Sequence, residues 1–389
     1  LSLTIEAGVI PYAEKGNQGN KAKEDYSQYK IALPDTLVIN SMNVIIGAVG
    51  ISQYFGCVSP VYYVFEPIEG TDLRYIYYLF TNTGFQKEMR KYAKGILEIR
   101  LRISSNDMLK RIVPSPPFKE QQRIADYLDK MCAEIDAVLE KTRASIEEYK
   151  KLKQAVITQA VTKGIRGDRP MKNSGIEWIG DIPESWEVSS VRYIGQLQNG
   201  ISKGGEFFGK GFPFVSYGDV YKNYELPHSV SGLIDTTEDE RAKYSVEYGD
   251  IFFTRTSETI EEVGFSCVCK RSIPNATFAG FIIRLRPFCA DEKILTDYAK
   301  YYFRGEHIRA YLVKEMNLVT RASLGQTLLK GMSVIVPPKS VQKEIAEYLD
   351  DKCADIDALV AKKQQYLTEI ENYKKSLIYE YVTGKKEVV

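Results

Sequence analysis

The sequence predicts an α+β chain in which two mixed, β-rich globular units are separated by two long helices. The segment PPFKEQQRIADYL at 116–128 returns as PPKSVQKEIAEYL at 337–349, an offset of 221 residues (337 minus 116). A repeat of this length indicates a duplicated architecture independently of any single motif. Each copy carries a heptad pattern, and short β-rich runs precede each copy. We expect the helices to pair as an antiparallel coiled coil, so that the chain has a pseudo-twofold internal repeat.

The length of 389 residues suits two or three domains, and 44% hydrophobic with 26% charged residues is an ordinary soluble composition. No run of about 18 apolar residues predicts a membrane helix, and no signal peptide is recognisable. Six cysteines without CxxC spacing predict a reduced, cytoplasmic protein. A net charge of +1 argues against holding nucleic acid by bulk charge alone, so any DNA binding must be local or shared with a partner.

The repeat and the changes in pattern predict six segments. The order is a globular unit, a helix, a linker, and then a second globular unit, helix and tail. Their predicted bounds are 1–115, 116–165, 166–173, 174–336, 337–384 and 385–389.

Apolar residues at steps of three and four predict the pairing faces of the two helices. The pairing residues we select are Leu128, Ile135, Tyr149, Leu349, Ile356 and Tyr373. The positions predicted between them are Met131, Val138, Ser145, Leu152, Lys352, Leu359 and Tyr366, with Thr142 and Lys363 as polar breaks. Proline pairs at 116–117 and 337–338 predict the helix starts. Two separate dimerisation helices are the alternative to mutual pairing.

Polar and basic residues beside aromatic ones are the candidate DNA contacts, because Arg and Lys bond guanine while Ser, Thr and Tyr contact phosphates or base edges. Asn40 and Ser41 stand where the repeat places Arg255 and Thr256 in the second unit, and Arg102 stands near the position of Arg321. Ordinary surface roles are the alternative for each residue. The full set of candidates is Asn40, Ser41, Arg102, Lys203, Tyr217, Arg255, Thr256 and Arg321.

The repeated PPxxEQQRIADYLD segment, the motif IGDIPESW and the order of the segments resemble the DNA-specificity subunit of type I restriction-modification systems. The resemblance covers essentially the whole chain. It implies two target recognition domains that each read half of a split DNA sequence, with the helices as a ruler between them. It also implies a subunit that has no catalytic site, metal or cofactor of its own. The implied partners are double-stranded DNA, two modification subunits that carry S-adenosylmethionine and the adenine methyltransferase site, and restriction subunits, with no membrane.

The first unit is shorter than the second in this comparison. It has 34 residues before Asp35, while 74 lie between Gly175 and the corresponding Asp250, a difference of 40 (74 minus 34). We therefore expect the first recognition domain to be incomplete at its N-terminal side.

Other functions compete with this interpretation. Residues 115–118, Ser-Pro-Pro-Phe, match the pattern of amino-methyltransferases, although the second copy reads Val-Pro-Pro-Lys. Residues 204–210 form GxxxxGK, which lacks the Ser or Thr of a phosphate-binding loop. A coiled-coil scaffold that never touches DNA is a further alternative. The two histidines, His228 and His307, have no metal-ligand spacing and are expected at the surface or in packing.

Overall fold

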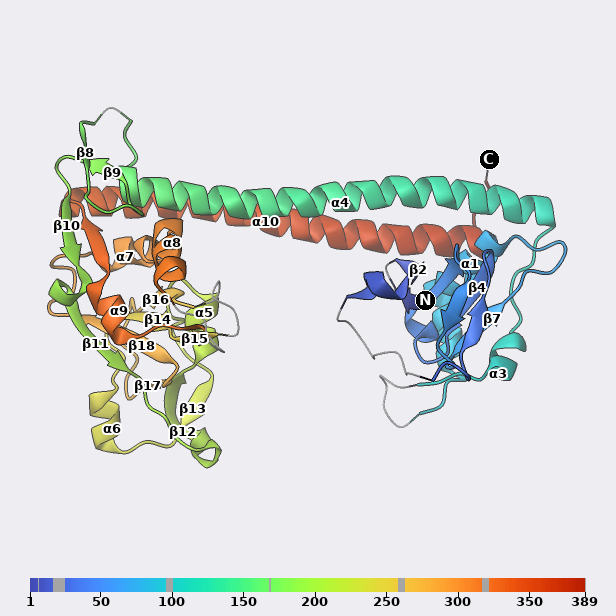
Figure 1. The fold of residues 1–389 in the computed structure, drawn as a ribbon, viewed down its shortest axis with the longest axis horizontal. Helices are drawn as coiled ribbons and strands as arrows, with labels where there is room; N and C mark the ends of the chain where they lie inside the picture. The colour runs from blue at the N-terminus through green and yellow to red at the C-terminus, as the bar shows by residue number, and fades with distance from the viewer. Residues whose placement is uncertain are drawn as a thin grey trace. The chain divides into compact units, whose positions relative to one another are not determined.

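The structure is a computed structural model, and it describes residues 1–5, 7–16, 25–95, 101–167, 169–257, 263–316 and 322–388. The chain forms two compact units, 1–145 with 362–389 (unit 1) and 146–361 (unit 2), and each is described by itself (Figure 1). Within the described residues, no helix combines the length and apolar character that crossing a bilayer requires.

Unit 1 is built around strand β4 (Thr36–Asn40), whose five residues are all buried. It pairs antiparallel with β5 (Val49–Ser52) on one side and β7 (Tyr62–Phe65) on the other. Helices α1 (Leu73–Thr81) and α2 (Thr83–Arg90) contribute to the same core, in which Phe85 and Met89 pack with Leu37 and Ile39. The remaining elements are the strand pairs β1 (Ser2–Thr4) with β2 (Gly8–Ile10) and β3 (Lys30–Ala32) with β6 (Gly56–Val58), and helix α3 (Ser105–Leu109).

Unit 2 has the same central arrangement in a larger form. Strand β14 (Ile251–Thr254) pairs antiparallel with β16 (Ser266–Val268) and β18 (Ile282–Pro287), and β11 (Gly195–Asn199) extends the sheet. A second sheet has the order β13 (Gly232–Ile234), β12 (Phe208–Val215), β17 (Thr277–Phe278). Its other elements are β8 (Met171–Asn173), β9 (Asp181–Pro183), β10 (Glu187–Ser190), α5 (Tyr217–Lys222), α6 (Glu238–Lys243), β15 (Thr256–Ser257), α7 (Thr296–Tyr302), α8 (Glu306–Glu315), β19 (Ala322–Ser323), α9 (Gln326–Gly331) and β20 (Ser333–Val336).

The order of elements repeats between the units. In each, a buried central strand lies between two antiparallel partners, and three helices then lead into a long helix: α1, α2, α3 and α4 in the first half, α7, α8, α9 and α10 in the second. The predicted α+β fold with an internal repeat is therefore confirmed.

The two long helices are α4 (Phe118–Lys163) and α10 (Lys339–Val382). They run antiparallel in both units, because Asp136 pairs with Lys374 at 2.6 Å in unit 1 and Lys153 pairs with Asp357 at 2.6 Å in unit 2. The two ion pairs are equivalent under the repeat, since 374 minus 153 and 357 minus 136 both give 221. The helices thus pair with each other, as the repeat predicts.

The buried face of each long helix matches the predicted pairing face at alternate positions. At the positions in between, the buried residue is the one that follows the predicted residue. Leu128, Ile135, Leu349 and Ile356 are buried and Tyr149 is half-buried, but Tyr373 is 53% exposed and lies outside the seam. The buried positions between them are Cys132, Leu139, Ile146, Cys353 and Leu367, each one residue after the predicted position.

Thr142, predicted as a polar break, is a buried seam residue. Its hydroxyl donates to the Val138 carbonyl at 2.7 Å, so the buried oxygen has a partner within its own helix. The seam therefore continues through this residue with a regular spacing of three and four.

Matching tyrosines tie each globular part to both long helices. In unit 1 the Tyr75 hydroxyl donates to the Val382 carbonyl at 3.0 Å, and Tyr78 donates to Asp129 at 2.7 Å. In unit 2 Tyr298 donates to the Val161 carbonyl at 3.1 Å, and Tyr301 donates to Asp350 at 2.7 Å. Each globular part is therefore held by the start of one long helix and the end of the other.

Candidate DNA interface

Arg255 and Thr256 lie where the central strand of unit 2 becomes a hairpin. The backbone of Arg255 is fixed on both sides, because its N–H donates to the Phe281 carbonyl at 2.9 Å and its carbonyl accepts from Leu324 at 2.7 Å. Thr256 pairs with Ser323 across β15 and β19. The guanidinium of Arg255 makes no hydrogen bond or ion pair with any residue that the structure describes, and the side chain is half-buried. A fixed backbone thus carries an arginine whose guanidinium has no partner among the described residues.

Helix α5 lies against the base of this hairpin. Its start is fixed by a capping box between Ser216 and Asp219. Tyr217 stacks on Tyr221 with ring centroids 5.9 Å apart, and Tyr221 meets the edge of Phe265 at 5.2 Å. The Phe265 N–H donates to the Thr254 hydroxyl at 2.9 Å, which closes the hairpin. We call Tyr217, Tyr221, Arg255, Thr256 and Phe265 the α5–hairpin surface; all five are half-buried.

Lys203 is not part of this surface. Its ammonium pairs with Glu240 at 2.6 Å and donates to the Asp235 carbonyl at 2.9 Å, and its side chain is only 14% exposed. The GxxxxGK segment that follows runs into strand β12, not into the helix that a phosphate-binding loop requires. Lys203 therefore ties its loop to the start of α6.

The candidates in unit 1 fall into two groups. Asn40 is 7% exposed and accepts a hydrogen bond from the Met42 N–H at 3.0 Å, and Ser41 is fully buried. These two residues shape the turn after β4 and offer no surface to DNA. Arg102 is exposed, and its backbone is bonded to Lys94 in both directions.

Arg321, the remaining candidate in the second half of the chain, lies outside the described residues.

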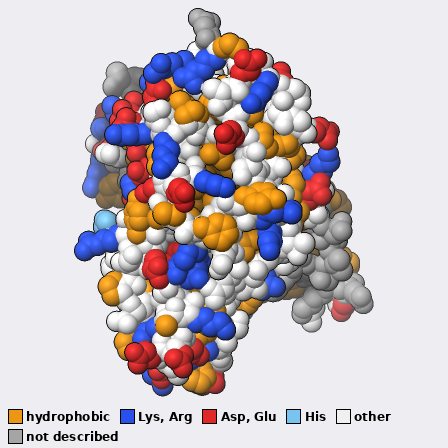
Figure 2. Space-filling view, turned by 90° about the vertical axis from the view of Figure 1, so that its left-hand side faces the viewer, with side chains coloured by type: hydrophobic (Ala, Val, Ile, Leu, Met, Phe, Trp, Pro, Cys, Tyr) orange, Lys and Arg blue, Asp and Glu red, His pale blue; other side chains and the backbone are white. Residues whose placement is uncertain are grey.

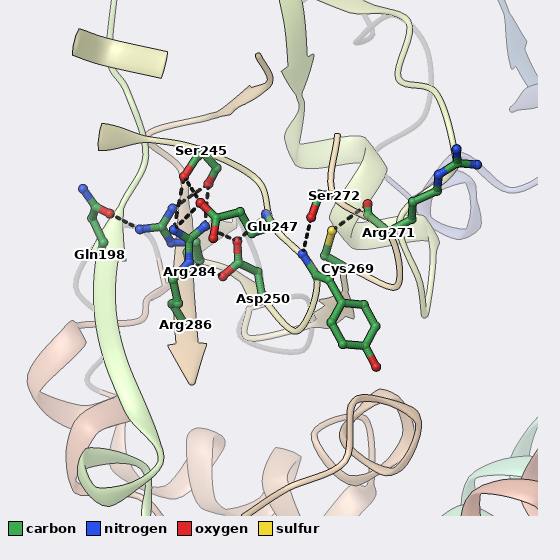
Figure 3. A network of polar contacts seen from close by, with 10 residues as sticks. Gln198, Ser245, Glu247, Asp250, Cys269, Arg271, Ser272, Arg284 and Arg286 are labelled. Carbon is green, nitrogen blue, oxygen red and sulfur yellow. Dashed lines mark hydrogen bonds and ion pairs between the residues drawn. The ribbon is translucent and has the colours of Figure 1, made fainter. Parts of the chain in front are cut away.

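A polar network at the start of β14 was not foreseen from the sequence (Figure 3). Asp250, fully buried, accepts two bonds from Arg286 at 2.6 and 2.7 Å, and Arg286 also reaches Glu247 at 2.9 Å. The neighbouring Arg284 donates to Ser245 and Gln198. Burial raises the pKa of Asp250, and its bonds to Arg286 oppose that rise. The network joins β18 to the loop that enters β14, the strand that ends at Thr254, one residue before Arg255.

The sequence contains one signal for this network. Arg284 and Arg286 are two apart on a strand, which places both side chains on one face of the sheet. Two arginines on one face of a buried strand require acceptors. The acidic residues before β14 supply acceptors for Arg286, and Arg284 is bonded to the Ser245 carbonyl and the Gln198 side chain.

His307 is a packing residue, as expected. It lies 5% exposed between Trp178, at a centroid distance of 6.1 Å, and Tyr302, at 4.9 Å. Burial lowers its pKa to about 3, so the ring is neutral in the folded protein.

This burial predicts a loss of stability in acid. The folded pKa lies below the unfolded value of about 6.5, so only the unfolded chain takes up a proton as pH falls through 6.5. Between pH 7 and pH 5 we expect His307 to reduce the free energy of unfolding by about 2 kcal/mol. Denaturant unfolding at both pH values should show this loss in the wild type and in H228Q, but not in H307F. An equal loss in H307F would contradict the assignment.

The Ser-Pro-Pro-Phe segment marks a helix start. The Gln121 side-chain amide donates to the Pro116 carbonyl at 2.8 Å, and its oxygen accepts from the Asp72 N–H at 3.0 Å. The second copy has the same arrangement, with Gln342 bonded to the Pro337 carbonyl at 2.8 Å and to the Leu295 N–H at 2.7 Å. Because the second copy lacks the Ser and the aromatic residue, these contacts belong to the shared scaffold and not to a methyltransferase motif.

The surface charges are mixed. On the face drawn in Figure 2, lysines and arginines are interspersed with acidic and hydrophobic side chains. This pattern agrees with the net charge of +1 and with DNA contact through local residues.

Two related globular modules on a pair of antiparallel helices define a duplicated recognition scaffold. The chain matches the type I restriction modification DNA specificity domain over residues 2–148 and 183–371, and it belongs to this family.

Curated relatives carry the same description. The chain is 24% identical over 279 residues to the type I restriction enzyme EcoKI specificity subunit of Escherichia coli (strain K12), covering 70% of this chain and 57% of that one. It is 26% identical over 322 residues to the MjaVIII specificity subunit of Methanocaldococcus jannaschii, covering 82% and 71%. The chain thus spans little more than half the length of the first of these relatives.

Solved structures share the fold. A chain from a study of complex assembly and conformational transition of the type I R-M system superposes with a TM-score of 0.72 at 15% identity, covering 92% of this chain and 85% of that one. The HsdS subunit from Thermoanaerobacter tengcongensis superposes with a TM-score of 0.50 at 15% identity, covering 92% and 84%.

Proposed function

We propose that this chain is the sequence-specific DNA-recognition subunit of a cytoplasmic type I restriction-modification complex. It reads a bipartite target and positions the methyltransferase and restriction subunits, and it catalyses no reaction itself. The observation that carries the proposal is the duplication of one module, with matched ties to the long helices, in a chain of this family. A duplicated recognition module is suited to a bipartite target, in which each module binds one half-site.

The α5–hairpin surface is the proposed contact of the second domain with its half-site. Arg255 supplies a forked donor that matches the two acceptors of guanine in the major groove, and Thr256 supplies a hydroxyl. In the first domain Arg102 is the exposed candidate. The net charge is only +1, so the complex must supply further phosphate contacts.

The antiparallel helices set the distance between the half-sites. Helices of 46 and 44 residues span about 65 to 70 Å at 1.5 Å per residue. We therefore expect a fixed gap between the two halves of the target.

Exposed apolar residues beside the seam are the proposed docking sites for two modification subunits. Val138 and Tyr373 in unit 1, at 39% and 53% exposure, correspond under the repeat to Leu359 and Leu152 in unit 2, at 44% and 49%. In an antiparallel pair these flanking positions face each other across the helices. Two equivalent apolar patches fit two copies of one partner, which brings its own S-adenosylmethionine.

This docking predicts a loss of assembly without a loss of folding. Replacing both Val138 and Tyr373 with serine should weaken binding of the modification subunit at one site at least tenfold, because two exposed apolar anchors are removed. The thermal unfolding of the isolated chain should change little. Titration calorimetry with the modification subunit checks this, with K141S and K375S as a surface control; unchanged stoichiometry and affinity would contradict the site.

Mapping methylated adenines tests the proposed function. The modification subunit is expressed in a host without other adenine methylation, with and without this chain. We expect a bipartite motif with a fixed gap only when the chain is present. Methylation at the same sites without the chain, or S-adenosylmethionine binding by the chain alone, would overturn the proposal.

A further inference from the structure

Arg304 is a buried cation in unit 2. Its side chain belongs to a residue that is 8% exposed, and no carboxylate among the described residues pairs with it. Its guanidinium instead donates to four backbone carbonyls, those of Ser266 at 2.6 Å, Val220 at 3.0 Å, Tyr221 at 3.2 Å and Asn223 at 2.6 Å. Burying an arginine that is bonded only to carbonyls costs free energy. The segments that Arg304 holds together explain its presence.

The carbonyls that Arg304 binds belong to two elements. Three lie at the C-terminal end of α5, where helix carbonyls lack intrahelical partners and a positive charge is favourable. The fourth is the first residue of β16, the return strand of the hairpin that carries Arg255. The rings of Tyr224 and Phe265 lie 4.6 and 4.9 Å from the guanidinium. Arg304 therefore fixes α5 relative to the hairpin.

A second arginine acts on the same hairpin. Arg309, in helix α8, donates to the Val263 carbonyl and lies 5.3 Å from the ring of Phe265. Arg304 holds Ser266 at the start of β16, and Arg309 holds Val263, which lies closer in sequence to the turn of the hairpin. Arg304 is buried against Phe265 of the α5–hairpin surface, while Arg309 is half-buried beside the same ring.

The repeat supplies an internal comparison. Tyr78 and Tyr301 are equivalent through their bonds to Asp129 and Asp350, so Arg304 corresponds to Thr81, three residues after Tyr78. The Thr81 hydroxyl donates only to carbonyls of its own helix, at 3.1 and 3.2 Å. Among the described residues of unit 1, no α-helix precedes the central strand as α5 does in unit 2. The arginine is therefore not part of the scaffold that the two units share.

We propose that Arg304 is a positioning residue that sets the base specificity of the second recognition domain. It acts by holding α5 and the hairpin in one relative geometry, so that Tyr221, Arg255 and Thr256 meet the half-site together. This inference rests on the proposed function and goes beyond it, because it assigns specificity to a residue that does not touch DNA.

The test compares methylation maps of complexes formed with the full wild-type chain, R304Q and R304K. We expect R304Q to raise methylation at sites with one mismatch in the second half-site about tenfold relative to matched sites. Mismatches in the first half-site should stay as poorly methylated as before. R304K should be intermediate, because an ammonium keeps the charge but cannot reach all four carbonyls. R192K, at an exposed arginine of unit 2, is the control and should not change the map.

The outcomes separate this inference from the proposed function. An unchanged map for folded R304Q, or equal relaxation in both half-sites, would overturn the positioning role. If R304Q does not assemble, R309Q decides: relaxation confined to the second half-site supports the role, and an unchanged map rejects it. Absence of any bipartite motif with the wild-type chain would instead count against the proposed function.

Discussion

Replacing Leu349 with alanine should lower the free energy of unfolding by about 3 kcal/mol, because the side chain is fully buried and its loss leaves a cavity. Leu359→Ala on the same helix removes the same atoms from a side chain that is 44% exposed. That change should cost less than about 1 kcal/mol. Denaturant unfolding of the isolated chain measures both.

The comparison tests the register of the coiled coil. Both leucines lie in the seam that simple apolar spacing predicts, but only Leu349 lies in the seam that the structure shows. Equal destabilisation by the two substitutions would mean that the register described here is wrong.

Asp250→Asn should also cost about 3 kcal/mol, because it removes the fully buried carboxylate that accepts two bonds from Arg286. Asparagine keeps the shape of the side chain, so the loss of unfolding free energy measures the contribution of the negative charge and of the second acceptor oxygen. The matched change Glu247→Gln affects an acid that is 53% exposed and should cost less than about 1 kcal/mol. Chemical denaturation near neutral pH distinguishes them, and a small effect of Asp250→Asn would show that the network is dispensable.

The repeat made the helix pairing predictable from the sequence, but not its register. At some of the positions where the predicted and the observed seams differ, both of the neighbouring residues are apolar, as with Met131 beside Cys132 and Val138 beside Leu139. Spacing alone cannot choose between steps of three and four when both neighbours are apolar. Thr142 added to the error, because a threonine whose hydroxyl bonds its own helix can be buried.

The candidate interface was predictable only in part. Arg255 was selected because it stands beside aromatic residues, and the structure fixes its backbone by hydrogen bonds on both sides. Lys203 has the same sequence signature, but its partner Glu240 lies 37 residues away, a contact that only the folded chain creates. Arg304 was missed because its acceptors are backbone carbonyls, which leave no trace in the sequence. A comparison of the two repeats at Thr81 and Arg304 is the signal that could have marked it.

The affinity of the assembled complex for DNA with each half of the mapped motif scrambled in turn tests the central claim most directly. If two domains read two half-sites at a fixed spacing, scrambling either half should weaken binding about 100-fold, and a longer gap between intact halves should weaken it as well. The same affinity for all these DNAs at one salt concentration would contradict the account, because the chain would then contribute charge but no sequence recognition.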